Sequence, residues 1–365
     1  MAPLRIDFIH PLLLPLGCAA AGAAVLGLLA LGFRASAAPT GSYPVGTKTF
    51  HLVDTSRPEL FSRDTSAHRE LMVQFWFPAA NEGGAIPAGK YPLLIFSPAW
   101  DGQRDQNTFQ VEDLARRGFI VSGLDHPFGS AATQFPDGRI VRADPDLAID
   151  FSNDASYARF LKNAETQLSV RTGDVRFVLD QIEKPNAVDD VLRKAIDPQR
   201  VGVFGHSFGG AVAAEVCATD SRFRAGLDMD GVLFGKAREV RVRQPFLFMN
   251  DDTERPAASQ IAMDNPARFL QRGFHDMDAF LVRNGGFMMT IRGAGHLSFE
   301  DGPTGLRRII SKRLQKIETG RAHQIVNAYT LAFFEKTLNG QKTIMLDGNS
   351  SAYPEVEFQS FQPPP

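Results

Sequence analysis

The sequence is poor in cysteine and in clusters of metal-binding side chains. Only Cys18 and Cys217 occur among its 365 residues, and neither cysteine nor histidine recurs at the spacing of metal ligands. Residues 231–236 (GVLFGK) are one residue short of a phosphate-binding loop and lack its Ser or Thr. We therefore expect neither a metal ion nor a bound cofactor.

An excess of charge of one sign is missing as well. The 39 Lys and Arg residues nearly balance the 41 Asp and Glu residues, and no stretch is basic enough to form a nucleic-acid-binding face. With 44% hydrophobic and 22% charged residues, the composition is that of an ordinary globular protein. Nucleic acid is therefore not an expected partner.

The beginning of the chain differs from the rest. Residues 11–33 carry no charge, arginines bracket this apolar run, and an Ala-Ser-Ala tripeptide follows it. This order is typical of a secretory signal, and the run is also long enough to span a bilayer. We predict that residues 1–37 are a signal peptide or an N-terminal membrane anchor, and that the protein is periplasmic, secreted or anchored to the membrane. Cys217 would then be the only cysteine left, which excludes an internal disulfide.

Beyond this leader, short apolar runs alternate with stretches of helical spacing. Such alternation predicts an α/β fold with a mostly parallel sheet of about eight strands, covered by helices on both faces. We expect residues 38–365 to form one catalytic domain. The predicted strands are 47–54, 71–77, 93–97, 119–125, 201–205, 225–230, 245–249 and 287–293, and the predicted helices are 106–117, 166–183, a helix from 208, 262–283 and 321–338.

The most informative stretch is VGVFGHSFGGAVAAEV at residues 201–216. Apolar residues lead into Gly-His-Ser-Phe-Gly and an alanine-rich run follows, which predicts a strand, a tight turn and a helix with Ser207 in the turn. Glycines permit the strained backbone and close packing that such a turn needs, so the hydroxyl is held above the sheet edge. The alternative is a chance Gly-x-Ser-x-Gly in a loop, but the strand and helix on either side favour a nucleophile.

A serine hydroxyl is a weak nucleophile unless a base removes its proton, so a histidine must approach Ser207. His296 follows the last predicted strand in the glycine-rich TIRGAGHLSFED, and a loop there can reach the same sheet edge. His126 also follows a strand, but it precedes the serine, against the Ser, acid, His order of this arrangement. His206 belongs to the turn itself and should point away. We predict that His296 is the base.

An acid must hold the imidazole in the correct tautomer. Asp230 ends the strand at 225–230, whereas Asp251 and Asp252 follow the next strand. Asp228 and Asp230 point to the same side of their strand, so periodicity does not separate them. The residue types and their spacing alone leave Asp230 and Asp251 about equal.

A tetrahedral intermediate also needs two backbone N–H donors for its oxyanion. Phe208, the residue after the nucleophile, supplies one, and the loop after the strand at 93–97 supplies the other. Pro98 has no N–H, so the second donor is Ala99 or Trp100.

Taken together, these segments resemble the plasma-type platelet-activating factor acetylhydrolase family and its bacterial relatives. That family consists of α/β-hydrolases that cleave short or oxidised acyl chains from lipids. The resemblance runs from residue 91 to residue 301 in family order. It is carried by the segments YPLLIFSPAW, RRGFIVSGLDH, DPQRVGVFGHSFGGA, RFRAGLDMDGVLFG and TIRGAGHLSFED.

The resemblance implies a catalytic set of Ser207, Asp230 and His296, with Trp100 and Phe208 as the oxyanion donors. It thereby favours Asp230, which lies 23 residues after Ser207, over Asp251, which follows the next strand.

The chain departs from the family in one motif. Pro98-Ala99 stands where the family usually has a His-Gly pair, so a preference for acetyl-sized groups is not implied. Residues 126–160 look irregular and match the family poorly, and we expect the substrate-facing cover there.

These observations predict a serine carboxylic-ester hydrolase that acts on short-chain or lipid-type esters through an acyl-enzyme. The catalytic set does not name the leaving group, so a thioesterase, an amidase, a dienelactone hydrolase and a polyester hydrolase are alternatives. Outside enzymes, the alternative is a membrane-tethered binding protein on a hydrolase scaffold, which the complete Ser, Asp and His set disfavours.

Overall fold

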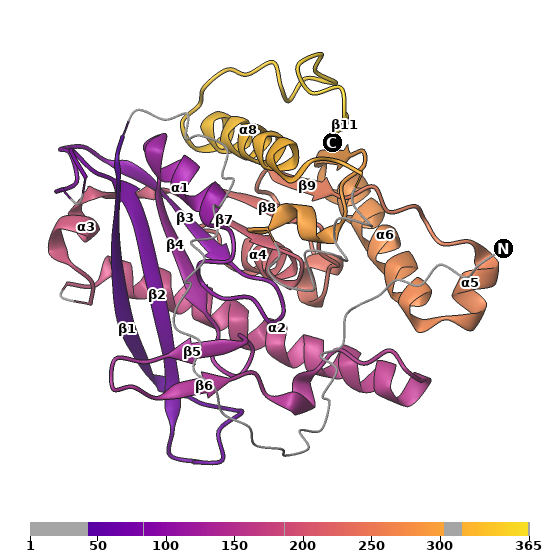
Figure 1. The fold of residues 1–365 in the computed structure, drawn as a ribbon, viewed down its shortest axis with the longest axis horizontal. Helices are drawn as coiled ribbons and strands as arrows, with labels where there is room; N and C mark the ends of the chain where they lie inside the picture. The colour runs from indigo at the N-terminus through magenta and orange to yellow at the C-terminus, as the bar shows by residue number, and fades with distance from the viewer. Residues whose placement is uncertain (1–42, 83, 186, 303–315, 364–365) are drawn as a thin grey trace, which may run out of the picture.

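The computed structural model describes residues 43–82, 84–185, 187–302 and 316–363. Nine strands form one sheet in the order β1-β2-β4-β3-β7-β8-β9-β10-β11 (Figure 1). β4, β3, β7, β8, β9 and β10 are parallel, while β1 with β2, β2 with β4 and β10 with β11 pair antiparallel. The strands are β1 (Val45–Pro58), β2 (His68–Pro78), β3 (Tyr91–Ser97), β4 (Ile120–Asp125), β7 (Ile196–His206), β8 (Ala225–Met229), β9 (Phe246–Asn250), β10 (Gly286–Ile291) and β11 (Val356–Phe361).

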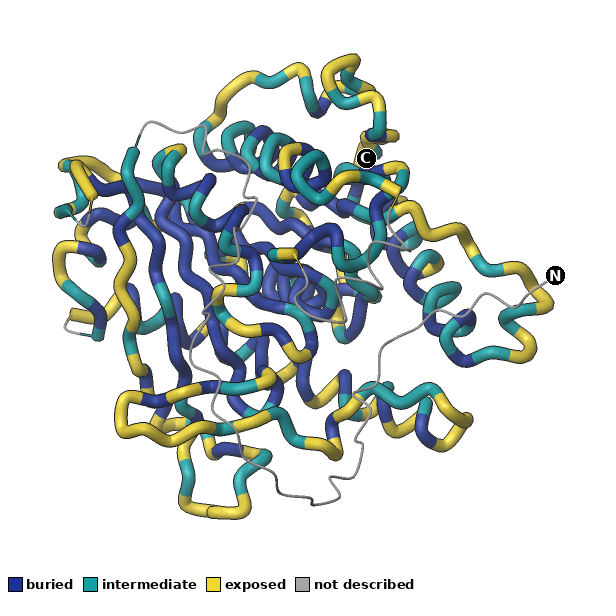
Figure 2. Tube along the Cα trace, in the orientation of Figure 1, coloured by how far each residue is buried: buried dark blue, intermediate teal, exposed yellow. Residues whose placement is uncertain are grey.

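Helices cover both faces of this sheet, as an α/β-hydrolase fold requires (Figure 1). One face packs against α1 (Thr108–Arg116) and α8 (Thr319–Leu338), and the other packs against α2 (Asp154–Glu183), α3 (Asp190–Ala195), α4 (Phe208–Thr219) and α6 (Asn265–Asn284). Successive residues of β3 face alternate cores, because side chains alternate across a strand: Leu93 and Ile95 join the α2 side, Leu94 and Phe96 the α8 side. Figure 2 shows the resulting buried sheet beneath exposed loops.

Smaller elements lie beside these layers. A two-stranded hairpin of β5 (Ala132–Gln134) and β6 (Ile140–Arg142) follows β4, and α5 (Ala258–Met263) precedes α6. Three short 3₁₀ helices are η1 (Pro145–Leu147), η2 (Gly235–Arg238) and η3 (His296–Phe299).

The α/β fold and each predicted strand are confirmed. The short elements β5, β6 and α3 were not predicted, and the main elements show three differences. The sheet gains β11, which pairs with β10 at the sheet edge. α2 begins at Asp154, twelve residues before the predicted start at residue 166, so residues 154–160 of the segment predicted as irregular are helical. The first turns of α2 already carry helical spacing, with apolar residues at Tyr157, Phe160, Leu161 and Ala164, and Asn153 caps the helix by accepting the N–H of Ser156 at 3.0 Å.

The third difference concerns the helix predicted over 262–283, which is two helices. α5 ends at Met263, and α6 starts afresh with Pro266 in its first turn. Proline lacks an N–H and fits the first turn of a helix, whereas it interrupts a helix interior.

The leader predicted over residues 1–37, including Cys18, lies outside the described residues. Within the part of the chain that is described, no helix is both long and apolar enough to cross a membrane.

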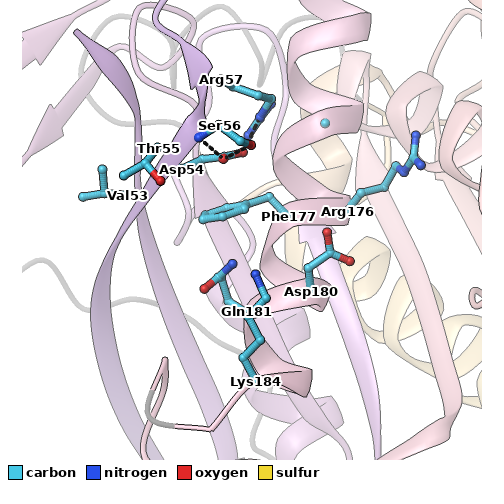
Figure 3. Close-up of a pocket in the computed structure, with 11 residues that line it drawn as sticks. Val53, Asp54, Thr55, Ser56, Arg57, Arg176, Phe177, Asp180, Gln181 and Lys184 are labelled. Atoms are coloured by element: carbon cyan, nitrogen blue, oxygen red, sulfur yellow. Dashed lines mark hydrogen bonds and ion pairs between the residues drawn. The ribbon is translucent and has the colours of Figure 1, made fainter.

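A cavity of about 450 Å³ lies between β1 and α2 (Figure 3). Its lining comprises residues 53–57, five residues of α2 and Lys184, which follows the helix, and none of them is a predicted site residue. Its charged groups are largely paired, since Arg57 contacts Asp54 at 2.5 Å and Arg176 contacts Asp220 at 3.5 Å.

Candidate active site

Ser207 lies in a strained turn between β7 and α4. Its backbone has φ 56° and ψ −121°, a region that residues other than glycine seldom adopt. The Ser207 N–H donates to the carbonyl of Met229 at 2.7 Å, which ties the turn to the end of β8. Among the described residues only three non-glycine residues have positive φ, and Ser207 and Asp230 are two of them. Backbone strain of this kind clusters at functional sites.

The two glycines that flank this turn are required by close backbone contacts. A Cβ at Gly209 would lie 1.9 Å from the carbonyl oxygen of Ser97, and a Cβ at Gly205 would lie 2.2 Å from the Gly209 carbonyl carbon. Any larger side chain would force β7, α4 and the end of β3 apart. The Gly-x-Ser-x-Gly pattern thus follows from the packing that lifts Ser207 above the sheet edge.

His296 and Asp230 come together beside this turn. Nδ1 of His296 lies 2.6 Å from Oδ2 of Asp230, and Oδ1 of Asp230 accepts the N–H of Asp251 at 2.9 Å. The Asp230 side chain is only 13% exposed, whereas the His296 side chain is 38% exposed. The imidazole therefore has a fixed, buried carboxylate on one side and access to solvent.

Burial and the charge of the partner have opposite effects on the pKa of each of these two groups. Burial disfavours the charged imidazole, but the hydrogen bond and negative charge of Asp230, with a contribution from Asp251, raise the pKa of His296 above its usual value. Burial also opposes ionisation of Asp230, yet the His296 contact holds the pKa of Asp230 below its usual value. This electrostatic arrangement stabilises an imidazolium next to a carboxylate, which is the state that a general base passes through.

The other acids near the strand ends have different partners. Asp228 is buried and accepts the N–H of Gly231 at 2.8 Å, and burial raises its pKa well above the usual range. The carboxylate of Asp251 binds its own loop at Thr253, and that of Asp252 accepts the N–H of Gly293 at 2.8 Å. Of the candidate acids, Asp230 is the one whose carboxylate contacts His296.

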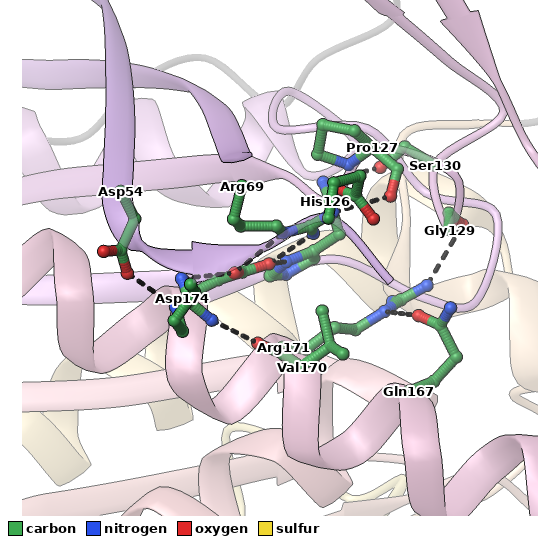
Figure 4. A network of polar contacts seen from close by, with 12 residues as sticks. Asp54, Arg69, His126, Pro127, Gly129, Ser130, Gln167, Val170, Arg171 and Asp174 are labelled. Carbon is green, nitrogen blue, oxygen red and sulfur yellow. Dashed lines mark hydrogen bonds and ion pairs between the residues drawn. The ribbon is translucent and has the colours of Figure 1, made fainter. Parts of the chain in front are cut away.

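His126, the competing base, belongs to a separate buried network (Figure 4). Its Nδ1 lies 2.9 Å from Oδ2 of Asp174, and its Nε2 lies 3.2 Å from Oγ of Ser97. This second Ser-His-Asp set is fully buried, and burial lowers the pKa of His126 to about 4. Because neither Ser97 nor His126 reaches solvent, a substrate cannot meet them, and the set holds the end of β3 in place.

His206 lies under the catalytic candidate rather than against Ser207. Its Nε2–H donates to the backbone carbonyl of His296 at 3.0 Å, and the two rings are 4.7 Å apart. Burial, followed by the neighbouring His296, lowers the pKa of His206 to about 3, so its ring is neutral. His206 thus supports the loop that carries His296.

The two predicted oxyanion residues are neighbours. The rings of Trp100 and Phe208 stack edge to face with centroids 4.6 Å apart, and Phe208 is the first residue of α4. The N–H of Ala99, the alternative donor, instead binds Oε1 of Gln106 at 2.8 Å. The Ala99 N–H is thus engaged within the loop, and Trp100 stays the predicted second donor. Gln106 was not singled out by the sequence, because a lone glutamine outside a motif gives no signal.

Aromatic side chains from distant segments surround Trp100 and Phe208. Phe160, from α2, lies 5.5 Å from the Trp100 ring, and Phe234 lies 5.6 Å from the Phe208 ring. Phe269, from α6, contacts both of these phenylalanines. Phe160 lies in the segment predicted as the substrate-facing cover. Phe234 and Phe269 were not predicted to lie near the site, because an isolated phenylalanine is usually a core residue.

Comparison with known proteins gives the same picture. The family "Platelet-activating factor acetylhydrolase, isoform II" matches residues 64–351. The chain belongs to this family. Its similarity to platelet-activating factor acetylhydrolase from Bos taurus is 29% identity over 291 residues, which cover 73% of this chain and 61% of that protein.

A probable 1-alkyl-2-acetylglycerophosphocholine esterase from Arthroderma benhamiae is 27% identical over 284 residues, which cover 73% of this chain and 66% of that protein. The chain thus spans less than two thirds of the length of these family members. A ferulic acid esterase from Streptomyces cinnamoneus has the same fold, with a TM-score of 0.71 and 27% identity over 88% of this chain and 98% of that one. Family and fold therefore both connect the chain to ester hydrolases.

Proposed function

We propose that the chain is a serine carboxylic-ester hydrolase that acts on short-chain or lipid-type esters, with Ser207 as its nucleophile. The observation that supports this most strongly is the 2.6 Å contact between His296 and Asp230 beside the strained turn of Ser207. Membership of the acetylhydrolase family and an esterase as structural neighbour support the same reaction class.

In the proposed acylation step, Oγ of Ser207 attacks the ester carbonyl carbon while Nε2 of His296 accepts the hydroxyl proton. Asp230 holds the proton on Nδ1, so that the lone pair of Nε2 is free, and then stabilises the imidazolium. The N–H groups of Trp100 and Phe208 donate to the oxyanion. The tetrahedral intermediate collapses when the bond to the alcohol breaks, and His296 gives its proton to the leaving alkoxide.

Deacylation repeats this chemistry with water in place of Ser207. His296 removes a proton from the water, whose oxygen attacks the acyl carbon, and the same two N–H groups stabilise the second oxyanion. Ser207 leaves as the alkoxide and takes the proton back from His296. The products are a carboxylic acid and the regenerated enzyme.

A chain-length series of p-nitrophenyl esters tests this proposal, with Ser207→Ala beside the parent. We expect acetyl and butyryl esters to turn over in the parent and not in the variant. Phospholipids with a short second acyl chain are the next substrates to compare. Turnover of matched thioesters or amides without turnover of esters would favour the other acyl hydrolases, and no turnover of any acyl substrate would favour a binding protein.

We also propose that residues 1–37 direct export of the protein. The uncharged run between two arginines and the Ala-Ser-Ala that follows it support this. Intact-mass measurement of the exported protein distinguishes the two forms: cleavage after Ala37 gives a chain that begins at Ala38, and a retained leader places the full-length protein in the membrane fraction. Full-length protein in the cytosol would contradict export.

A further inference from the structure

One buried arginine touches both predicted oxyanion residues. Arg171 lies on α2 with no exposed surface, and its guanidinium carbon is 5.1 Å from the ring centre of Phe208 and 5.8 Å from that of Trp100. It belongs to none of the sequence motifs, and the proposed mechanism does not use it. A buried charge is costly unless hydrogen bonds satisfy it, so its partners identify its role.

Those partners are mainly backbone carbonyls of the loop after β3. Nη1 of Arg171 donates to the carbonyl of Ala99 at 2.9 Å and more weakly to that of Pro98 at 3.4 Å. Nη2 donates to the carbonyl of Trp100 and, at 3.0 Å, to that of Gly129 (Figure 4). Three successive carbonyls of the loop therefore converge on one side chain.

This convergence fixes the direction of the Trp100 N–H. In a trans peptide, the carbonyl of one residue and the N–H of the next point in opposite directions. The Ala99 carbonyl accepts from Arg171 and also from the N–H of Gly102 at 3.0 Å, and the Trp100 N–H in the same peptide plane points away from these two donors. Gln106 holds the preceding peptide plane, because its Oε1 accepts the N–H of Ala99 at 2.8 Å.

Arg171 is held in turn by its own helix and remains a cation at neutral pH. Its Nε donates to Oε1 of Gln167 at 3.3 Å, one turn earlier on α2. Burial lowers the pKa of Arg171 to about 9, although the charges of Asp101 and Asp174 oppose this shift. The guanidinium thus keeps its positive charge next to both donors.

We infer that Arg171 is a positioning residue of the oxyanion hole, which acts by aiming the Trp100 N–H through the Ala99 carbonyl. The inference rests on the proposed function, since an oxyanion exists only if an acyl group is transferred. Arg171 itself touches neither the nucleophile nor the base. Its loss therefore weakens transition-state stabilisation and leaves ground-state binding largely intact.

The test compares Arg171→Lys with the parent in full-length protein. Lysine keeps the charge but cannot reach three carbonyls with a planar fork. We expect kcat for p-nitrophenyl butyrate to fall by up to about 10²- to 10³-fold, the range seen for loss of one oxyanion donor, while KM changes less than about threefold. A trifluoromethyl ketone, which forms a tetrahedral oxyanion on the nucleophilic serine, should lose affinity by the same factor as kcat/KM.

Arg69→Lys is the matched control, because Arg69 is also buried but binds Asp174 and Glu59 instead of the oxyanion loop. It should lower thermal stability without the parallel loss of ketone affinity. If Arg171→Lys does not fold, Gln167→Met serves as the second variant, because it removes only the acceptor for Nε of Arg171. It should lower kcat and the affinity for the ketone, both by a smaller factor than Arg171→Lys.

Two results would overturn the inference. One is that the folded variants keep kcat and ketone affinity within about threefold of the parent, far below the effect of a lost oxyanion donor. The other is that the Arg69→Lys control loses ketone affinity as strongly as Arg171→Lys, which would make the effect one of general packing. If the parent itself neither hydrolyses the ester nor binds the ketone, the proposed function fails, and this inference fails with it.

Discussion

The imidazole of His296 lies 2.6 Å from the carboxylate of Asp230, although 66 residues separate them in the chain. Asp230 follows β8, and His296 follows β10, so the parallel sheet brings their strand ends to one edge. Ser207 reaches the same edge from β7, and its N–H binds the last residue of β8. The sheet thus assembles, from three strand ends, the groups that the proposed reaction needs.

Asp230→Asn should lower kcat by about 10⁴-fold, because an amide at this position favours the wrong tautomer of His296. Steady-state kinetics with a p-nitrophenyl ester measures this. Asp251→Asn is the control: its contact with Asp230 is made by the backbone N–H, which the substitution keeps, so kcat should stay within about tenfold of the parent. The reverse order of effects would assign the acid to Asp251.

The rate should rise with pH as His296 loses its proton, because only the neutral imidazole can accept the proton of Ser207. Asp230 and Asp251 raise the pKa of His296 despite its burial, so the midpoint of kcat/KM should lie above the usual histidine value. Removing one negative charge in Asp251→Asn should move this midpoint to lower pH. A midpoint that stays in place or moves upward would show that Asp251 does not act on the base.

Gly209→Ala should disrupt the turn, because the added Cβ would lie 1.9 Å from the Ser97 carbonyl oxygen. We expect a clear loss of thermal stability together with a loss of activity. Gly320→Ala is the matched control in the first turn of α8, where a Cβ meets nothing within 4 Å, so the melting temperature should not fall. Equal melting temperatures for Gly209→Ala and the parent would contradict the packing argument.

Asp174→Asn should destabilise the fold. The carboxylate is fully buried and contacts Arg69 at 2.6 Å, Arg57 at 2.9 Å and His126 at 2.9 Å. Losing one partner of a buried ion pair leaves an uncompensated charge, which typically costs about 3–5 kcal/mol. Urea unfolding measures this change.

Asp180→Asn supplies the comparison for that measurement. Asp180 pairs with Arg222 at 2.7 Å, but its side chain is 48% exposed, so its loss should cost less than about 1 kcal/mol. Similar unfolding free energies for the two variants would mean that the buried network does not stabilise the fold.

The order of strands and helices could be predicted because apolar runs and helical spacing are local properties of the chain. What failed depended on tertiary contacts. β11 is a short C-terminal strand whose pairing with β10 no local pattern indicates. The early start of α2 is different, because Tyr157, Phe160 and Ala164 stand at helical spacing after the cap residue Asn153, so this part of the helix had a local signal that the prediction did not use.

The site was predictable to the extent that its chemistry follows motifs. Ser207 and His296 stand in glycine-marked segments at strand ends, whereas the choice of Asp230 needed the family resemblance, because Asp251 fits the same chemistry. Gln106 and Arg171 gave no signal, because their roles depend on the directions of the N–H and carbonyl groups of one loop. Arg171 lies 72 residues after Ala99 of that loop and is adjacent to it only in space.

Covalent labelling by a fluorophosphonate, with the modified residue mapped by mass spectrometry, tests the central claim most directly. Such reagents react with a serine only when a base and an oxyanion hole activate it. The account predicts one adduct per chain, on Ser207, with complete loss of ester hydrolysis and no adduct in Ser207→Ala. An active enzyme with Ser207 unlabelled, or a Ser207→Ala variant that hydrolyses esters as fast as the parent, would contradict it.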